Sequence, residues 1–143
     1  YEMTGVMKNI LFSGSVTVSN STFDSDKEVL VGGVVALNRG TMINIHHTGI
    51  IEVKEEVRNT IVVGGVTSIN YGAMSHSSNS GTINLLSKRG FYIFAGGVVG
   101  VTYTDVSFIS NTGTINVDIL TNRSSWVGGL IGRINQGENP VEL

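Results

Sequence analysis

Four pairs of adjacent glycines recur along this chain at one constant interval. A series of single glycines follows in step, each at the same distance from the pair before it. A period this strict means that one structural unit is repeated, so the chain must fold as a succession of similar units. The pairs are Gly32 and Gly33, Gly64 and Gly65, Gly96 and Gly97, and Gly128 and Gly129; the single glycines are Gly49, Gly81 and Gly113.

The repeat organises the 143 residues as a single domain. The expected units are a partial unit at 1–30, full units at 31–62, 63–94 and 95–126, and a partial unit at 127–143. The first unit carries three extra residues, because the interval from Gly14 to Gly32 is longer than the one from Gly49 to Gly64. The last unit places one extra residue before Ile134 and Asn135. The chain starts without a methionine, and we expect it to be a fragment of a larger protein.

Apolar residues recur at the same place in successive units, and within a unit they are spaced by two. Many of them are β-branched, which together with the spacing is typical of β-strands. No segment shows the 3.6-residue periodicity of an amphipathic helix. The columns are Leu30, Val62, Phe94 and Trp126; Val34, Val66, Val98 and Leu130; Leu37, Ile69 and Val101; Val16, Ile51, Ile83 and Ile115; and Val18, Val53, Leu85 and Val117.

These aligned columns predict an all-β fold, a parallel β-solenoid of about four coils with a 32-residue repeat. Coils of a solenoid stack at about 4.8 Å, so that like residues form ladders inside. A unit has room for about three short strands, near Val31–Leu37, Thr41–His47 and Ile50–Val57. The glycines would supply positive φ angles or tight corners between them. An antiparallel meander, as in a propeller blade, is the alternative, but blades need about 40 residues or more.

An Asn-x-Gly sequence recurs after the first predicted strand of a unit. It occurs at Asn38–Gly40, Asn70–Gly72 and Asn135–Gly137, whereas the third unit has Thr102–Thr104 at this point. Asparagine tolerates the left-handed region and hydrogen-bonds to nearby backbone. The motif therefore predicts a corner of the coil.

Composition excludes several classes of function. Charged residues make up 14% of the chain and the net charge is −2, so we expect neither a nucleic-acid surface nor an anionic-membrane surface. No apolar run approaches the roughly 18 to 20 residues of a membrane span, and we expect no membrane insertion. Cysteine is absent, which excludes disulfides and thiolate chemistry.

No set of residues specifies catalysis, a cofactor or a metal ion. His46 and His47 point to opposite faces if they lie on a strand, and His76 aligns with neither of them. Basic residues interleave with the acidic ones, so we interpret the acidic stretches as solvated loops; they comprise Asp24, Asp26, Glu28, Glu52, Glu55 and Glu56. We therefore expect no catalytic, cofactor-binding or metal-ligating residue in this segment.

One variable loop combines aromatic and cationic side chains outside the apolar columns. It contains Lys88, Arg89, Phe91 and Tyr92. Aromatic residues and arginine are enriched where proteins contact one another. This loop is the predicted partner surface, while Phe94 and Trp126 are assigned to the core because they belong to an apolar column.

The repeat resembles the GLUG repeat, a glycine-rich motif of bacterial surface proteins. The resemblance is carried by VGGVVALNRG from Val31 with TGII from Thr48, and by VGGVTSINYG from Val63 with SGTI from Ser80. A degraded copy, AGGVVGVTYT with TGTI, begins at Ala95. The best-known proteins with this repeat are the streptococcal immunoglobulin A1 proteases, which are zinc metalloproteases attached to the cell wall.

This resemblance implies a non-catalytic spacer and docking module of a secreted protein attached to a Gram-positive cell wall. Its expected partner is the catalytic domain of the same chain or immunoglobulin A1. The zinc ligands of such an enzyme would lie outside these 143 residues. An adhesin stalk without protease activity is the alternative, and a polysaccharide-active β-helix enzyme is a weaker one.

Overall fold

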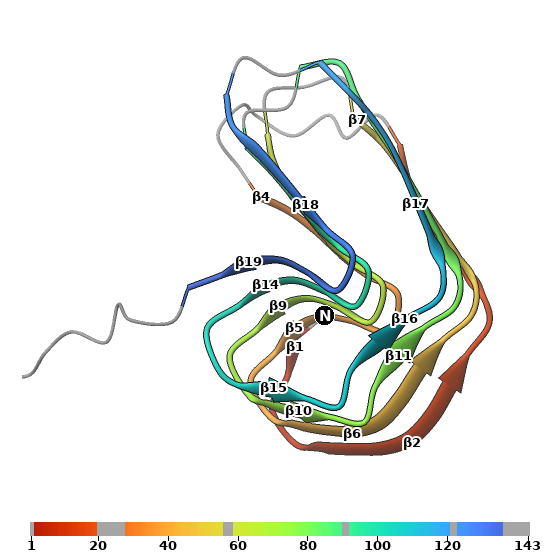
Figure 1. The fold of residues 1–143 in the computed structure, drawn as a ribbon, viewed down its shortest axis with the longest axis vertical. Helices are drawn as coiled ribbons and strands as arrows, with labels where there is room; N and C mark the ends of the chain where they lie inside the picture. Colours follow the sequence, from red (N-terminus) through yellow and green to blue (C-terminus); the bar gives the residue numbers. More distant parts are fainter. Residues whose placement is uncertain (1, 20–27, 56–58, 90–91, 121–122, 136–143) are drawn as a thin grey trace, which may run out of the picture.

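The computed structural model describes residues 2–19, 28–55, 59–89, 92–120 and 123–135. In this part of the chain the protein is all-β and forms the predicted parallel β-solenoid of about four coils (Figure 1). Each strand pairs in parallel with the equivalent strand of the next coil, so that Ile51 lies beside Ile83 and Val62 beside Phe94. The described residues include no helix that could cross a membrane.

The strands form four parallel sheets, which we number in the order in which a coil passes through them. Sheet 1 contains β4 (Glu28–Gly32), β8 (Thr60–Gly64), β13 (Ile93–Gly96) and β18 (Ser125–Gly128). Sheet 2 contains β1 (Glu2–Met3), β5 (Val35–Asn38), β9 (Thr67–Asn70), β14 (Val99–Thr102) and β19 (Ile131–Ile134). Sheet 3 contains β2 (Val6–Phe12), β6 (Thr41–His47), β10 (Ala73–Ser75), β11 (Ser78–Asn79), β15 (Val106–Ser107) and β16 (Ser110–Asn111). Sheet 4 contains β3 (Ser15–Ser19), β7 (Ile50–Glu55), β12 (Thr82–Ser87) and β17 (Thr114–Ile119).

A full coil passes through four sheets, so the prediction of three strands was wrong. The predicted strand Val31–Leu37 is divided at the glycine pair into β4 and β5, which turn back on each other (Figure 1). A Cβ atom at Gly32 would collide with the carbonyl oxygen of Val35, so only glycine allows this corner. Gly64, Gly96 and Gly128 face the corresponding carbonyl of their own coils.

The second glycine of each pair has a different role, because it faces the next coil. A Cβ at Gly33 would collide with the carbonyl oxygen of Gly65, and one at Gly65 with that of Gly97. Gly49, Gly81 and Gly113 face in the other direction, each against a glycine carbonyl of the preceding coil. Close approach between coils, rather than backbone dihedral angle, is therefore what requires these glycines.

Of the two roles expected for the glycines, tight corners are confirmed at the glycine pairs, whereas positive φ is found neither at the glycines nor at the Asn-x-Gly corners. None of the described glycines lies in the left-handed region. The non-glycine residues found there, with φ of 50–59°, occupy one column of sheet 3 and are Asn9, Asn44, His76 and Phe108. The other part of the corner prediction is confirmed, since the Asn38 Oδ1 accepts a hydrogen bond of 3.0 Å from the Gly40 N–H.

Strand register confirms the apolar columns. Leu30 pairs with Val62, Val62 with Phe94, and Phe94 with Trp126. Residues of the first coil up to β3 are separated from their partners in the second coil by three more residues than those from β4 onward. This difference confirms the three extra residues of the first unit.

The predicted extra residue before Ile134 was wrong. Ile134 pairs with Thr102 at the regular spacing, so Ile134, and not Asn135, continues the column of Asn38 and Asn70.

Three apolar clusters hold the sheets together. The first lies between sheets 1 and 4, the second between sheets 2 and 3, and the third between sheets 1 and 2. Sheets 1 and 2 are therefore covered on both faces, and every residue of β9, β13 and β14 is buried. Burial on both faces explains why their sequences lack the alternation that marks the strands of sheet 4, such as β12.

Polar ladders run through two corners of the coil. Asn38 donates to Asn70 at 2.6 Å, and Asn70 donates to Thr102 at 3.2 Å, where sheet 2 meets sheet 3. His47 Nδ1 lies 2.8 Å from the Asn79 Oδ1 where sheet 3 meets sheet 4. These bonds provide partners for polar groups that are buried at the turns.

Glu55 corrects the interpretation of the acidic stretches as solvated loops. It is the last residue of β7 and is 1% exposed, facing the interior beside Ser87 of the next coil. Glu28 is exposed and Glu52 is half-buried, but both lie in strands, β4 and β7, so the loop prediction was wrong for them as well. Asp24, Asp26 and Glu56 lie outside the described residues.

Replacing Gly64 with alanine should lower the free energy of unfolding by about 2–4 kcal/mol, because the new Cβ would collide with the Thr67 carbonyl. Gly5 is the matched control, since a Cβ there meets nothing within 4 Å. Urea titrations of Gly64→Ala and Gly5→Ala measure the difference. Equal midpoints would show that the corner does not need glycine.

Replacing Glu55 with alanine should cost about 1–3 kcal/mol, since it removes a buried polar side chain from a packed position. The neighbouring Lys54 is exposed, so Lys54→Ala should stay within about 0.5 kcal/mol of the parent. Guanidinium titrations of the two variants measure these losses. An equally small loss for Glu55→Ala and Lys54→Ala would place Glu55 at the surface.

Candidate binding surface

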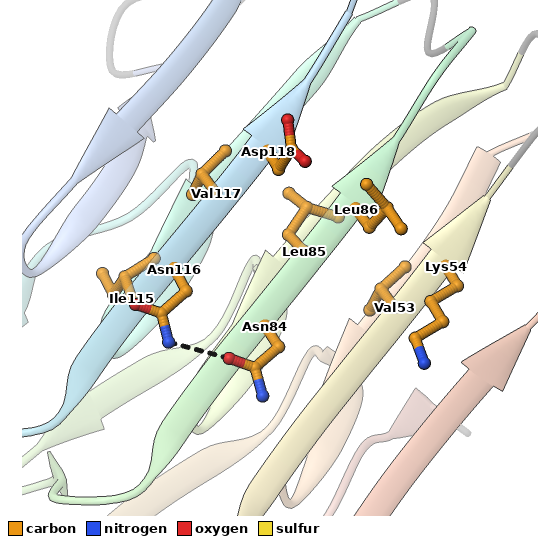
Figure 2. Close-up of a pocket in the computed structure, with 9 residues that line it drawn as sticks. All are labelled: Val53, Lys54, Asn84, Leu85, Leu86, Ile115, Asn116, Val117 and Asp118. Atoms are coloured by element: carbon orange, nitrogen blue, oxygen red, sulfur yellow. Dashed lines mark hydrogen bonds between the residues drawn. The ribbon is translucent and has the colours of Figure 1, made fainter.

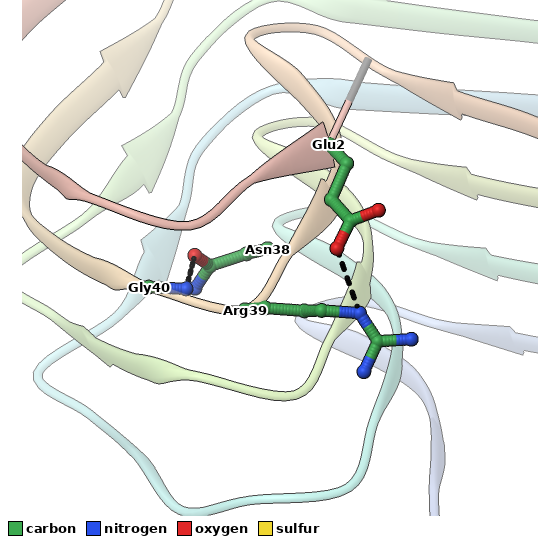
Figure 3. Close-up of polar contacts among 4 residues, drawn as sticks. All are labelled: Glu2, Asn38, Arg39 and Gly40. Atoms are coloured by element: carbon green, nitrogen blue, oxygen red, sulfur yellow. Dashed lines mark hydrogen bonds and ion pairs between the residues drawn. The ribbon is translucent and has the colours of Figure 1, made fainter.

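An exposed tyrosine column lies at the corner that follows sheet 2. It consists of Arg39, Tyr71 and Tyr103, which occupy equivalent positions in three successive coils. The rings of Tyr71 and Tyr103 stack with centroids 4.4 Å apart, and the Arg39 guanidinium lies 4.7 Å from the Tyr71 centroid. Arg39 Nε also donates to a carboxylate oxygen of Glu2 at 2.9 Å (Figure 3).

The Asn-x-Gly corner positions this column. Asn38 folds back on the Gly40 N–H, while Arg39 between them extends toward Glu2, as Figure 3 shows. At the next coil Asn70 also bonds to its own corner, but in the opposite sense, by donating to the Gly72 carbonyl at 3.0 Å. The middle residue of the motif therefore lies at the surface, and parallel register stacks it on the equivalent residue of the next coil.

A second group, the tryptophan cluster, consists of Tyr92, Phe94, Trp126 and Arg133. Phe94 and Trp126 stack with centroids 4.8 Å apart, and the Arg133 guanidinium lies within 5.4–5.6 Å of both centroids. Tyr92 adds a tilted contact with Trp126 at 6.3 Å. Arginine above aromatic faces in this way is a cation–π arrangement.

The tyrosine column and the tryptophan cluster border the same layer of the molecule. Phe94 and Tyr92 pack in the apolar cluster between sheets 1 and 2. The tyrosine column directly follows the strands of sheet 2. The charge of Glu28, the first residue of β4 in sheet 1, contributes to raising the pKa of Tyr71. Aromatic and cationic side chains thus gather around the layer formed by sheets 1 and 2.

Packing within the tyrosine column raises the pKa of Tyr71. Burial is the main cause, followed by the hydrogen bond and charge interaction with Tyr103, while the Arg39 charge opposes the shift. Tyr71 therefore remains a neutral hydrogen-bonding phenol at physiological pH.

The predicted partner surface stays a prediction, and the structure gives the exposure of three of its four residues. Lys88 and Arg89 are exposed, Tyr92 is half-buried against the tryptophan cluster, and Phe91 lies outside the described residues. Phe94 is buried as predicted. The core assignment of Trp126 was wrong, since Trp126 is 38% exposed on β18, the last described strand of sheet 1.

The tyrosine column was missed by the sequence analysis, although its signal was present. Arg39, Tyr71 and Tyr103 are the middle residues of aligned corner motifs. Large side chains at one exposed position of successive coils must lie side by side, so the period alone could have identified this column.

The three histidines lie in separate environments. Both ring nitrogens of His46 are engaged, with the Ser78 hydroxyl and the Asn44 amide oxygen, each at 2.7 Å. His47 is buried and stacks on Phe12. His76 stacks on Phe108 at 4.7 Å. Within the described ranges no three side chains of histidine, cysteine, aspartate or glutamate gather as metal ligands.

Sheet 4 carries a shallow hollow of about 470 Å³ on its surface (Figure 2). Its amide groups form a ladder, in which Asn116 donates to Asn84 at 2.8 Å. Its charged groups are a single pair of opposite sign, Lys54 and Asp118, which Leu86 separates in the same column. The lining therefore offers hydrogen-bonding groups but no pair of adjacent acid–base residues.

Comparisons of the chain with protein-family models, with curated proteins and with solved structures found no match.

Tyr71 should titrate above the ordinary tyrosine pKa of 10.0. Its folded-state pKa is raised, so its contribution to stability is complete below pH 10 and is lost as pH rises through the folded-state value. Tyrosinate absorbance of the parent and of Tyr71→Phe checks this. The variant should lack the latest-titrating component; loss of a component at or below pH 10 would contradict the packing described.

Proposed function

We propose that this chain is a non-catalytic β-solenoid module that acts as a rigid spacer and as a docking surface for a protein partner. The observation that carries the proposal is the concentration of stacked aromatic rings and arginine around sheets 1 and 2. Interiors of successive coils are nearly identical, so specificity must come from the outer positions at which the coils differ.

The spacer role is supported by the continuity of the coil stack. All four sheets pair in parallel from coil to coil, and three apolar clusters run along the stack. Bending such a stack would break backbone pairing in several sheets at once. The module would therefore hold whatever is attached to it at a defined distance and orientation.

The docking role is supported by the chemistry of the tyrosine column and the tryptophan cluster. Tyrosine, tryptophan and arginine are the residues that dominate the binding energy of protein interfaces. Stacking on neighbouring rings holds their side chains in place, which lowers the entropy lost when a partner binds. The exposed Trp126 indole offers a partner an apolar surface, and the exposed Arg39 guanidinium offers it polar groups.

The resemblance to GLUG repeats supports the identity of the partner. On that basis the parent protein is an immunoglobulin A1 protease attached to a Gram-positive cell wall, with its zinc in a separate catalytic domain. The module would then dock against that catalytic domain or against immunoglobulin A1. An adhesin stalk with the same repeats would dock against neither.

Fluorescence provides the test, because Trp126 is the single tryptophan of the chain. Addition of immunoglobulin A1 or of the catalytic domain should shift the Trp126 emission, while immunoglobulin G should not. Arg133→Ala and Tyr103→Ala should each weaken the binding about tenfold, as expected for interface anchors. Leu86→Ala, on the outer face of sheet 4, is the control and should leave it unchanged.

Two outcomes would contradict the docking role. One is the absence of an emission change with either protein at high micromolar concentration. The other is an affinity that Leu86→Ala lowers as much as Arg133→Ala does. A passive spacer would then be the better description of the module.

A further inference from the structure

The outer face of sheet 3 holds a serine hydroxyl against a histidine ring. The Nδ1 atom of His46 lies 2.7 Å from the Ser78 hydroxyl oxygen. The two residues are partners in register on β6 and β11, so the parallel pairing of these strands brings them together. Both side chains are half-buried, and the pair is therefore held in place while it remains in contact with solvent.

Asn44 determines which nitrogen of His46 carries the proton. The Asn44 Oδ1 lies 2.7 Å from the His46 Nε2, and the Asn44 Nδ2 donates to the Asn9 Oδ1 at 2.8 Å. Because the amide nitrogen is engaged with Asn9, the amide oxygen faces the imidazole, and this oxygen can only accept. The Nε2 of His46 therefore donates, and the neutral ring keeps its lone pair on Nδ1.

The hydroxyl of Ser78 consequently donates to the basic nitrogen of His46. A hydroxyl held on a base that is itself oriented by a third group is the arrangement that activates a serine as a nucleophile. His46 can accept the hydroxyl proton while the Ser78 oxygen attacks an electrophile. Asn44 touches neither the oxygen nor an electrophile, so it is a positioning residue.

The backbone of β6 supplies the position that Asn44 occupies. Asn44 has a φ of 59°, in the left-handed region that asparagine tolerates better than most residues. This bend places Ile43 and Asn44 together, half-buried, between the buried Met42 and Ile45. A regular strand would alternate at this point, so the bend provides the additional outer residue that holds the imidazole.

The strands that carry the three residues are interior strands of sheet 3. β6 pairs with β2 on one side and with β10 and β11 on the other. β11 pairs with β6 and with β16. The arrangement is therefore complete within the described coils.

The surroundings of the pair favour an uncharged electrophile. Lys8 is the single residue in the six described strands of sheet 3 that carries a permanent charge at neutral pH. Phosphoryl donors are anionic and are held by several cationic groups, which these strands do not provide. A carbonyl carbon with a good leaving group needs no such cations. An activated acyl ester, either an aryl ester or a thioester, is the class of compound that fits.

We propose that Ser78 is a covalent modification site that accepts an acyl group from an activated ester, with His46 as the base and Asn44 as the positioning residue. The Ser78 oxygen forms a bond to the carbonyl carbon while its proton passes to the His46 Nδ1. The bond from that carbon to the leaving oxygen or sulfur then breaks, and the leaving group departs with the electron pair and receives the proton from His46.

The product is an ester of Ser78, so the module is an acyl acceptor in a single transfer. The site lies on sheet 3, whereas the docking role concerns the layer formed by sheets 1 and 2. The modification and the docking role can therefore fail independently of each other.

Acetylation by p-nitrophenyl acetate tests the proposal with the chain as it is. Ser110 is the internal control, because it is the partner of Ser78 in the next coil and pairs with no histidine among the described residues. After short exposure in mildly alkaline buffer, peptide mass spectrometry should show acetylation of Ser78 about 100-fold faster than that of Ser110, the lower end of what a positioned base contributes. His46→Gln should reduce the rate at Ser78 to that at Ser110.

Two substitutions at Asn44 separate positioning from folding. Asn44→Gly allows the left-handed backbone but removes the amide, and it should slow acetylation of Ser78 at least about tenfold. Asn44→Asp keeps an acceptor for the His46 Nε2–H and should react at least as fast as the parent. Nitrogen NMR of the imidazole reports the tautomer directly. His46 should be protonated on Nε2 in the parent and on either nitrogen in Asn44→Gly.

Three results would overturn the proposal. The first is acetylation of Ser78 and Ser110 at equal rates. The second is an unchanged rate at Ser78 in His46→Gln, which would show that the imidazole is not the base. The third is a parent chain in which His46 is protonated on Nδ1, since the ring would then donate to Ser78 and could not accept its proton.

Discussion

The close approach of neighbouring coils at the glycine pairs is the constraint on which the rest of this structure depends. Backbone of one coil lies so near the glycine carbonyl of the next that no side chain fits at Gly33, Gly65 or Gly97. The first glycine of each pair meanwhile allows the chain to reverse from sheet 1 into sheet 2. This tight reversal places an apolar cluster between the two sheets and buries both of their faces.

Burial of sheets 1 and 2 determines where variation is possible. Their strands cannot carry functional side chains in the middle coils, so such residues must lie at corners and at the ends of the stack. The middle residue of each Asn-x-Gly corner is one such place, and it holds Arg39 and Tyr71. The open edge at β18 is another, and it exposes Trp126. The candidate binding surface is thus a consequence of the same reversal.

The 32-residue period predicts most of this fold, because register follows directly from spacing. The columns of Leu30 and of Ile51, the extra residues of the first unit and the parallel stacking are all confirmed. The division of a coil into four sheets was not predictable from alternation, since strands covered on both faces do not alternate. Burial of Glu55 was missed for a different reason: it stands two residues after Val53 and continues the inward alternation of β7, but its charge and those of its neighbours were interpreted as a solvated loop.

The most direct test of the central constraint is the cost of alanine along one glycine column. Gly33→Ala, Gly65→Ala, Gly97→Ala and Gly129→Ala introduce the same methyl group at equivalent corners of successive coils. Their free energies of unfolding can be compared by urea denaturation at a concentration where the chain is monomeric. We expect losses of about 2 kcal/mol or more at the first three positions and none at Gly129, because among the described residues nothing lies within 4 Å of the new methyl group. Equal losses at all four positions would contradict this account, because the cost would then come from the glycine backbone and not from the neighbouring coil.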